Sequence, residues 1–423
     1  MKDLRDFLRV DLSVEEEVDP EFEISAVLHA NPRRTVLFNR VKGSELRVVG
    51  NLITSRERMC QALGTTREEY IRHISALAER CDGELTHVDN APVYARRCSG
   101  LEELPVLKHF EKDAGRYITS GVVIARDEEH GRNASVHRML VLDSRHLAIR
   151  LVERHLHEYY SRAEAKGEPL EVAVVIGMHP ALLFAASYPL GINQDELRLA
   201  AALLGEPLEL AKCRSVDLEV PANAEVVIEG RLLPGVRVEE GPFTDITGTY
   251  DRVRKQPVLE VSAIYRREDA IYHALLPSSV EHRLLMGMPQ EPKIYASVAK
   301  VARVRQVVLT QGGCCWLHGV VAIEKRSEED AKKAILAALE AHPSMKHVVI
   351  VDGDIDVFNA EEVEFAIATR FQGDRDLTML RAVRGSSLDP SAGKSGLTAK
   401  LGIDATKALH NLEAYERARI PKR

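Results

Sequence analysis

The sequence lacks an apolar run long enough to cross a membrane. Its two most apolar stretches, 180–192 and 307–323, are short or interrupted by polar residues and glycines such as those at 311–313, whereas a spanning helix needs about 20 apolar residues. The first six residues are charged and contain no apolar signal core. We therefore expect a cytoplasmic protein without a membrane partner.

Cysteine is scarce, and no pattern suggests that it is paired. The chain has six cysteines in 423 residues, and none belongs to a C-x-x-C motif. A zinc site is therefore not expected, and a reducing compartment does not favour disulfides. The adjacent Cys314 and Cys315 are interpreted as core residues, because cysteine is among the most buried residue types.

The sequence also lacks an excess of positive charge. The net charge is -7 and the pI is near 6.2, which argues against nucleic acid as the main partner but leaves room for a local basic pocket. A hydrophobic share of 45% and a charged share of 29% are typical of a globular protein. A chain of 423 residues is expected to form two or three domains.

Common cofactor and catalytic motifs are missing too. The sequence contains no G-x-G-x-x-G, no G-x-x-x-x-G-K-[ST], no G-x-S-x-G and no H-E-x-x-H. The acidic segment 352–356 imitates the start of a calcium loop, but the required glycine and later glutamate are missing. We interpret it as a turn between a strand and a helix.

Hydrophobic periodicity predicts an α/β (α+β) protein in three parts, with boundaries at 1–114, 115–300 and 301–423. In the first part we expect strands at 34–39 and 45–50 and helices at 54–64 and 66–80, the last with Thr66 and Glu69 as a capping box. In the second, we expect strands at 117–126, 135–142, 171–177, 224–230 and 258–265 and helices at 144–162 and 195–204. In the third, we expect strands at 306–310, 319–323 and 347–351 and helices at 327–342 and 360–370, capped by Ser327 and Asn359. Many strands and few helices in the centre suggest a barrel-like core.

The most informative stretch follows the strand expected at 224–230. A rigid Gly241-Pro242 corner there lies between two acids, Glu240 and Asp245. Two carboxylates held near a shared cation can take different protonation states, so that one donates a proton while the other stays ionised. On pattern alone, a surface turn with solvated acids is the favoured interpretation of the segment.

The run E-G-P-F-x-D-x-x-G-x-Y at 240–250 resembles the signature of the UbiD decarboxylases. Segments similar to that family follow one another in the same order from about residue 115 to the C-terminus, at 220–230, 376–377, 387–391 and 400–406. The resemblance implies a central split β-barrel that binds flavin, flanked by α/β regions. It also implies that the C-terminal domain helps to form a homo-oligomer.

The resemblance implies a catalytic set in which an arginine lies between two acids. Carried over by motif, the set is Arg126, Glu240 and Asp245, with Asp245 as the proton donor. The family commonly has asparagine five residues before the arginine, where this chain has Gly121. The alternative for Arg126 is a surface charge at the end of a strand.

By the same resemblance, the cofactor is prenylated FMN, which a flavin prenyltransferase supplies. A divalent metal, Mn or Mg, would bridge its phosphate to His137 and Glu196, and a monovalent cation such as K⁺ would lie near the small residues at 185–189. Glu196 could equally be an acid that favours the first turn of a helix. The expected cofactor-binding residues are Ile124, Ala125, Arg126, Val136, His137, Ser187, Tyr188 and Lys400.

The implied activity is non-oxidative decarboxylation of an α,β-unsaturated or aromatic acid. Loss of CO₂ from an sp² carbon leaves electrons that the substrate cannot delocalise, so an organic cofactor must take them up. The favoured substrate is trans-anhydromevalonate 5-phosphate, which gives isopentenyl phosphate. The alternative substrate is a 4-hydroxybenzoate-type acid. The alternative functions are those of a flavin-binding protein without decarboxylase activity and of a flavin oxidoreductase.

Overall fold

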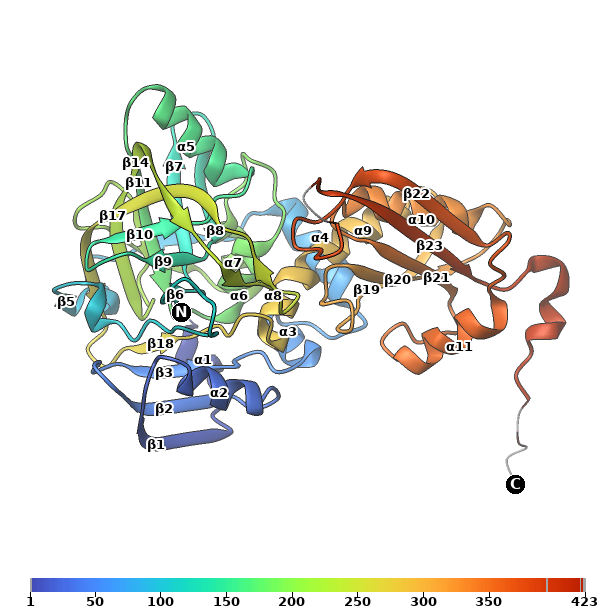
Figure 1. Cartoon of the computed structure of the whole chain (residues 1–423), viewed down its shortest axis with the longest axis horizontal. Helices are drawn as coiled ribbons and strands as arrows, with labels where there is room; N and C mark the ends of the chain where they lie inside the picture. The colour runs from blue at the N-terminus through green and yellow to red at the C-terminus, as the bar shows by residue number, and fades with distance from the viewer. Residues whose placement is uncertain (1, 393–394, 419, 421–423) are drawn as a thin grey trace. The chain divides into compact units, whose positions relative to one another are not determined.

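The computed structural model describes residues 2–392, 395–418 and 420, and it divides into two compact units, 1–285 and 286–423 (Figure 1). The two units meet between residues 285 and 286. The three-part division expected from the sequence, with boundaries near 115 and 301, stays a prediction. No helix among the described residues is long and apolar enough to cross a membrane.

The first unit begins with a four-stranded sheet in the order β1-β2-β3-β18. Its strands are β1 (Leu12–Val18), β2 (Val36–Val41), β3 (Arg47–Gly50) and β18 (Ile271–His273), accompanied by α1 (Leu4–Phe7), α2 (Glu23–Ala30), α3 (Arg56–Ala62) and α4 (Tyr70–Arg80). Half of the expected capping box is present, because Glu69 N donates to Thr66 Oγ1 at 3.3 Å before α4 begins.

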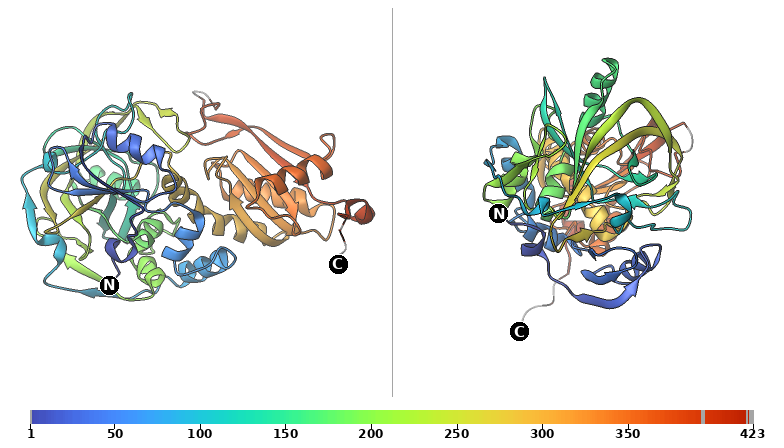
Figure 2. Two further views of the ribbon diagram at one scale, coloured as in Figure 1. Left: turned by 90° about the horizontal axis from the view of Figure 1, so that it is seen from below. Right: turned by 90° about the vertical axis from the view of Figure 1, so that its left-hand side faces the viewer.

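A nine-stranded sheet forms the centre of this unit, in the order β6-β9-β10-β17-β14-β11-β7-β8, with β5 also pairing with β17. Its strands are β5 (Arg96–Cys98), β6 (Tyr117–Ile118), β7 (Val122–Asp127), β8 (Gly131–Val136), β9 (Met139–Val141), β10 (His146–Ile149), β11 (Leu170–Ile176), β14 (Val226–Glu240) and β17 (Arg254–Arg266). The long β14 and β17, yellow-green to yellow in Figures 1 and 2, pair from Val226 opposite Arg266 to Glu240 opposite Arg254.

The connection between β8 and β9 requires this sheet to curl. β8 is one edge of the sheet and β9 lies next to the other edge, yet only His137 and Arg138 separate the two strands. Because two residues span only about 7 Å, the two ends of the sheet must lie side by side. The sheet is therefore a split barrel, and its seam contains Arg138.

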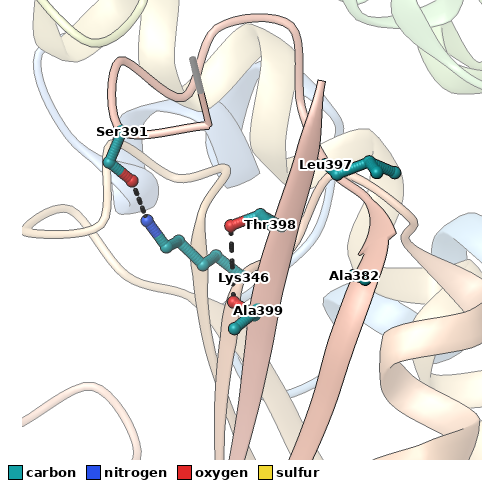
Figure 3. A pocket seen from close by; sticks show the side chains of 6 residues that line it. All are labelled: Lys346, Ala382, Ser391, Leu397, Thr398 and Ala399. Carbon is teal, nitrogen blue, oxygen red and sulfur yellow. Dashed lines mark hydrogen bonds between the residues drawn. The ribbon is translucent and has the colours of Figure 1, made fainter. Parts of the chain in front are cut away.

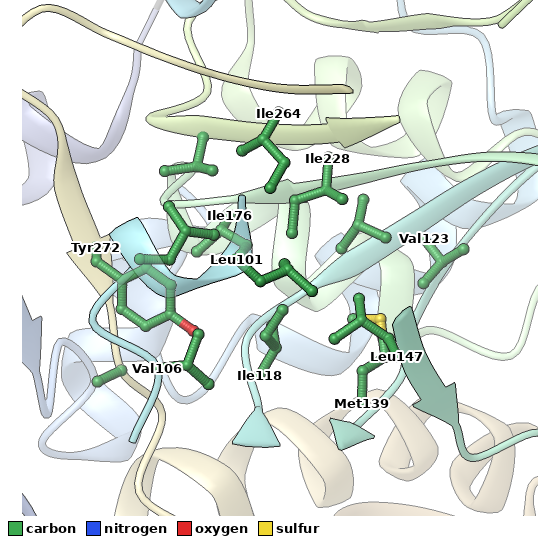
Figure 4. Close-up of a cluster of buried hydrophobic side chains, with 14 of the residues drawn as sticks. Leu101, Val106, Ile118, Val123, Met139, Leu147, Ile176, Ile228, Ile264 and Tyr272 are labelled. Carbon is green, nitrogen blue, oxygen red and sulfur yellow. The ribbon is translucent and has the colours of Figure 1, made fainter. Parts of the chain in front are cut away.

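The barrel interior is apolar and is shared with the N-terminal sheet. Buried residues of β2 and β3 belong to the same cluster as those of the barrel strands, and Figure 4 shows Leu147, Ile228 and Ile264 among them. One continuous core thus holds both sheets in one unit.

The smaller elements of the first unit lie around the barrel. They include a three-stranded sheet, a short hairpin and four further helices. Their bounds are β4 (Leu85–His87), β12 (Leu208–Lys212), β13 (Glu219–Pro221), β15 (Phe243–Thr244), β16 (Tyr250–Asp251), α5 (His155–Ala165), α6 (Pro180–Ser187), α7 (Glu196–Leu204) and α8 (Val280–Gly287), with 3-10 turns at Pro92–Tyr94 and Leu101–Glu103. The last helix, α8, crosses the division between the units.

The helix expected at 144–162 is wrong in its first half. Residues His146–Ile149 form β10, and α5 begins only at His155. β10 is held by antiparallel pairing with β9 on one side and β17 on the other. These long-range pairs override the helical pattern of the local sequence, and they create a loop, 150–154, that the prediction did not contain.

The second unit is a five-stranded sheet in the order β19-β20-β21-β23-β22, with helices on both faces (Figure 1). Its elements are β19 (Arg303–Leu309), β20 (His318–Glu324), β21 (His347–Asp352), β22 (Leu377–Arg384), β23 (Leu397–Ala405), α9 (Glu291–Val298), α10 (Asp330–Ala341) and α11 (Ala360–Arg370), with 3-10 turns at Met288–Gln290 and Leu409–Tyr415. Asn359 caps α11 as expected. Ser327 does not cap α10, which begins at Asp330; its hydroxyl donates to that carboxylate at 2.6 Å.

Candidate active site

Arg138 is the centre of a buried ion cluster in the barrel seam. Its Nε and Nη2 donate to the two carboxylate oxygens of Glu240 at 2.9 and 3.0 Å. Nη1 donates to Asp245 Oδ2 at 2.7 Å, and Nη2 also donates to Asp251 Oδ2 at 3.1 Å. The side chains of Arg138, Asp245 and Glu240 are 9%, 14% and 0% exposed. The two acids expected from the sequence therefore do share one cation.

Three separate elements bring these groups together. Glu240 is the last residue of β14, and Asp245 follows β15 in the turn to β16. Asp251 belongs to β16, where it pairs with Phe243. The Gly241-Pro242 bond, which is cis, turns the chain from β14 into this hairpin. The corner expected from the sequence thus places both carboxylates within hydrogen-bond distance of Arg138.

The surroundings of the cluster keep it charged. Burial opposes the Arg138 charge, but the hydrogen bonds and charges of Glu240, Asp245 and Asp251 raise the Arg138 pKa. Burial likewise opposes ionisation of Asp251, but the hydrogen bond from Arg254 and the charges of both arginines lower its pKa. The Arg138 guanidinium also lies 4.6 Å from the centre of the Phe243 ring, a favourable cation–π arrangement.

The arginine between the acids is therefore Arg138, where the sequence interpretation named Arg126. Arg126 is exposed at the end of β7, opposite Arg132 in the β7–β8 hairpin. The sequence did contain a signal for the right residue. Asn133 lies five residues before Arg138, which is the spacing that the resemblance required and that Gly121 failed to satisfy. The motif was present twelve residues further along the chain.

A second polar cluster surrounds Glu196, at the start of α7. Its carboxylate accepts hydrogen bonds from Ala134 N at 2.9 Å and Asn133 Nδ2 at 3.1 Å, and His155 Nδ1 lies 3.9 Å away. Burial raises the Glu196 pKa, which the hydrogen bonds partly offset. A carboxylate, an amide and an imidazole thus converge from α7, β8 and α5.

His137, the expected metal partner of Glu196, has both ring nitrogens engaged elsewhere. Nδ1 lies 2.9 Å from Arg150 O and Nε2 lies 3.0 Å from Ser135 Oγ. Burial lowers the His137 pKa to about 4, so the ring is neutral at physiological pH. The histidine beside Glu196 is His155, which the sequence interpretation did not name.

The other expected cofactor residues are dispersed. Ile124 and Ala125 are fully buried in β7, while Val136 ends β8 next to the seam. Ser187 Oγ donates to Leu183 O at 2.8 Å, within α6. Burial raises the pKa of the neighbouring Tyr188 to about 12. Lys400 belongs to the second unit, where its buried ammonium donates to Pro343 O at 2.5 Å. The Lys400 charge is thus engaged within that unit.

Two further histidines lie near the acidic turn. His109 is buried, and neither of its ring nitrogens has a hydrogen-bond partner among the described residues; burial lowers its pKa to about 3. Burial lowers the pKa of His282 as well, although the charge of Asp245 opposes the shift. Arg283, its neighbour in α8, donates to Ile246 O at 3.4 Å. α8 therefore packs on the turn that carries Asp245.

A cavity of about 450 Å³ lies in the second unit by the β22–β23 hairpin (Figure 3). Its one charged lining residue, Lys346, is neutralised by Asp389 at 2.9 Å and bonds to the Ser391 hydroxyl. A smaller cavity of about 310 Å³ is lined by residues such as Lys2, Gln61 and His179. Neither cavity contains acids that share a cation, so the Arg138 cluster is the better candidate.

Comparison with protein families identifies the class. The N-terminal, Rift-related and C-terminal domains of 3-octaprenyl-4-hydroxybenzoate carboxy-lyase match residues 12–78, 86–280 and 283–405. The chain belongs to the UbiD family of carboxy-lyases.

Individual proteins of known sequence or structure are similar to this chain over nearly its whole length. Over 408 residues, the chain is 47% identical to the anhydromevalonate phosphate decarboxylase of Methanothermobacter thermautotrophicus, covering 96% of each chain. Among solved structures, it resembles the UbiD-class enzyme HmfF from Pelotomaculum thermopropionicum in complex with FMN, with a TM-score of 0.96, 42% identity and coverage of 99% and 98%. An evolved dimeric form of that enzyme in complex with prFMN has a TM-score of 0.91, 40% identity and coverage of 99% and 97%.

The ion cluster predicts a large difference between two arginine variants. Arg138→Met should lower the free energy of unfolding by about 3–5 kcal/mol, because it leaves buried Glu240 without its cation. Arg126→Met, the matched control, should change it by less than about 0.5 kcal/mol. Urea unfolding followed by far-ultraviolet circular dichroism measures both, while fluorescence of the single tryptophan, Trp316, reports the second unit separately. Adding Glu240→Gln to Arg138→Met should recover part of the loss; equal effects of the two single variants would contradict the assignment.

Proposed function

We propose that this chain decarboxylates trans-anhydromevalonate 5-phosphate to isopentenyl phosphate and CO₂, with prenylated FMN as its cofactor. The Arg138–Glu240–Asp245 arrangement carries the proposal, because it places a potential proton donor beside a cation that can bind a carboxylate. Five archaeal relatives that are 43–47% identical bear the name anhydromevalonate phosphate decarboxylase, which supports the substrate.

One donor of Arg138 remains for the substrate. A guanidinium has five N–H groups, and four of them bond to Glu240, Asp245 and Asp251. The fifth belongs to Nη1, the nitrogen that also binds Asp245. A substrate carboxylate that accepts this hydrogen lies directly beside Asp245, so the carbon that loses CO₂ is within reach of that acid.

Each residue of the cluster has its own role in the proposed reaction. Prenylated FMN, when bound, supplies the electron sink that an sp² carbon lacks. Arg138 orients the carboxylate, and Glu240, which is fully buried, fixes the guanidinium through two parallel hydrogen bonds. As the carbon–carbon bond breaks and CO₂ leaves, the acid proton of Asp245 is transferred to the same carbon. Asp245, 14% exposed, regains a proton from solvent.

The residues around Glu196 would hold the divalent cation, which would supply positive charge for the cofactor phosphate. A buried carboxylate whose burial disfavours ionisation gains from a neighbouring cation, and Mg²⁺ or Mn²⁺ prefers oxygen ligands of this kind. Asn133 now donates through Nδ2; a flip of its amide presents Oδ1 to the same place. His155 completes a set of three donors. This set replaces the predicted pair of His137 and Glu196.

The metal assignment predicts a loss of bound cation in Glu196→Gln. The neutral amide lacks the charge that holds a divalent ion, so Mn²⁺ content of the purified holoenzyme should fall at least about tenfold. Glu158→Gln, a change in the nearby helix α5, should leave it unchanged. Metal content is measured by mass spectrometry of the acid-released ion, and equal content in both variants would remove Glu196 from the site.

The class of cofactor is tested by expression with and without a flavin prenyltransferase. Each sample is examined for released cofactor by mass and for CO₂ release from the phosphorylated acid and a panel of other unsaturated acids. Prenylated FMN, together with CO₂ release only in the paired sample, is the expected result. Absence of flavin from both folded samples would overturn the proposal, and turnover of another acid alone would overturn the substrate.

The role of Asp245 predicts that Asp245→Asn lowers turnover by about 10²–10⁴. Asn keeps an acceptor for Ile246 N, which now donates to Asp245 Oδ1 at 2.7 Å, but it has no acid proton to give. Flavin content should therefore stay at the wild-type level. Glu239→Gln, an exposed acid beside Glu240, is the matched control and should retain full activity. Full turnover in Asp245→Asn would assign the proton to another group.

A further inference from the structure

The smaller cavity, of about 310 Å³, lies among the helices of the first unit. It is lined by the C-terminal ends of α3 and α7, by His73 of α4 and by His179, the N-cap residue of α6. Small-molecule sites in proteins typically enclose about 300–1,000 Å³. The cavity is at the lower end of this range, so it suits a small ligand.

The cavity is separate from the candidate active site. α7 begins at Glu196 and ends at Leu204, and only the last residues of this helix line the cavity. A helix rises about 1.5 Å per residue, so its two ends lie about 12 Å apart. Arg138, Glu240 and Asp245 do not belong to the lining. A small ligand in the cavity therefore does not take part in the reaction proposed above.

His179 presents a hydrogen-bond donor to the cavity. It is only 5% exposed, and its Nδ1 accepts a hydrogen bond from Ala181 N at 3.2 Å, so the ring proton is on Nε2. The ring of Phe7 packs edge-on against the imidazole, with 5.3 Å between the ring centres. Within the described residues no group bonds to Nε2, yet this nitrogen is not sealed in the interior. Because His179 lines the cavity, Nε2–H points into it.

The surroundings of His179 keep it a neutral donor. Burial lowers the His179 pKa to about 4, helped by the charge of Lys2 and opposed by three nearby acids. The imidazole is therefore neutral at physiological pH. None of the three acids lines the cavity, and each accepts a hydrogen bond elsewhere. Their donors are Arg267 for Asp3, Asp3 N for Asp6, and Lys2 N for Glu206.

Lys2 supplies the positive charge of the cavity. Its ammonium donates to Leu204 O, at the C-terminal end of α7, at 2.7 Å. An ammonium has three N–H donors, so two remain for a ligand. Lys2, His73 and His179 all line the cavity, whereas no acid does so among the described residues. The side chains of the wall thus offer donors to an anion.

The rest of the wall is largely apolar. Ala62, Leu63, Leu203 and Leu204 line the cavity and are each buried. Apolar surface of this kind favours a ligand that carries hydrocarbon next to its charged group. An inorganic anion would leave this part of the cavity without a partner.

We propose that this cavity binds a small monocarboxylate with a short apolar chain. The carboxylate accepts hydrogen bonds from His179 Nε2 and Lys2 Nζ, and the chain packs on Leu63 and Leu203. One ammonium neutralises the single charge of a carboxylate. A phosphate dianion would keep an excess charge beside the C-terminal ends of α3 and α7, which carry partial negative charge. The chain thus has a second site for organic acids, apart from the site at Arg138.

Calorimetric titration of the flavin-loaded protein with butyrate tests the ligand class. We expect a Kd of about 1 mM, and at least about tenfold weaker binding of butyramide and butylammonium, which lack the negative charge. Lys2→Met should weaken butyrate binding about tenfold. His179→Asn, which keeps an N-cap for α6 but lacks Nε2–H, should do the same. Lys212→Met, at an exposed position of the same unit, is the matched control and should bind as the wild type does.

A crystal structure of the protein soaked in 4,4,4-trifluorobutyrate gives the location. Density for the acid beside His179, together with weaker binding in both variants at unchanged far-ultraviolet circular dichroism, supports the inference. Density only at Arg138, or butyrate binding that is unchanged in Lys2→Met and His179→Asn, would overturn it. So would tighter binding of butylammonium, or no binding of butyrate by the folded protein. None of these measurements requires turnover, so their outcome is independent of the proposed function.

Discussion

The guanidinium of Arg138 bonds to each of the segments that form the candidate active site. It lies in the two-residue connection that joins the ends of the central sheet, and it holds the end of β14 through Glu240 and the β15–β16 hairpin through Asp245 and Asp251. A buried carboxylate without its cation costs several kcal/mol. Closure of the barrel seam and assembly of the candidate catalytic acids are therefore the same structural event.

The three acids of the cluster are not held equally. Glu240 accepts two hydrogen bonds from Arg138, and Asp251 accepts one from Arg138 and one from Arg254, whereas Asp245 accepts a single hydrogen bond from an arginine. Asp245 is also the most exposed of the three. Asp245 is therefore the acid of the cluster that has the fewest bonds to arginine and the most contact with solvent, as the proposed role in proton transfer requires.

The sequence predicted that Glu240 and Asp245 share a cation, as they do, because their motif is local. Glu240 and Asp245 are separated by a corner of four residues, so their spacing survives folding. The arginine is over one hundred residues away, and two arginines offered a match. Arg126 follows an apolar run, whereas Arg138 follows Asn133 at the expected spacing of five residues. The pairing of β9 with β10 places Arg138 in the seam.

The loop 150–154 was missed for a related reason. A helix predicted over 144–162 places Arg150, Arg154 and His155 on one regular surface, but β10 takes the first residues and turns the loop toward the seam. Strand pairing is a long-range effect that local periodicity does not report. Arg150 and Arg154 in that loop, and His155 at the start of α5, consequently had no assigned role in the sequence interpretation.

The bonds that Arg138 makes within the protein fix its position. Four of its five N–H donors bond to Glu240, Asp245 and Asp251, so one hydrogen bond remains for a substrate. A cation held in one position suits a reaction that needs one geometry, because misplaced groups lose rate steeply. In the proposed enzyme, the acids that surround Arg138 therefore determine where the substrate carboxylate binds.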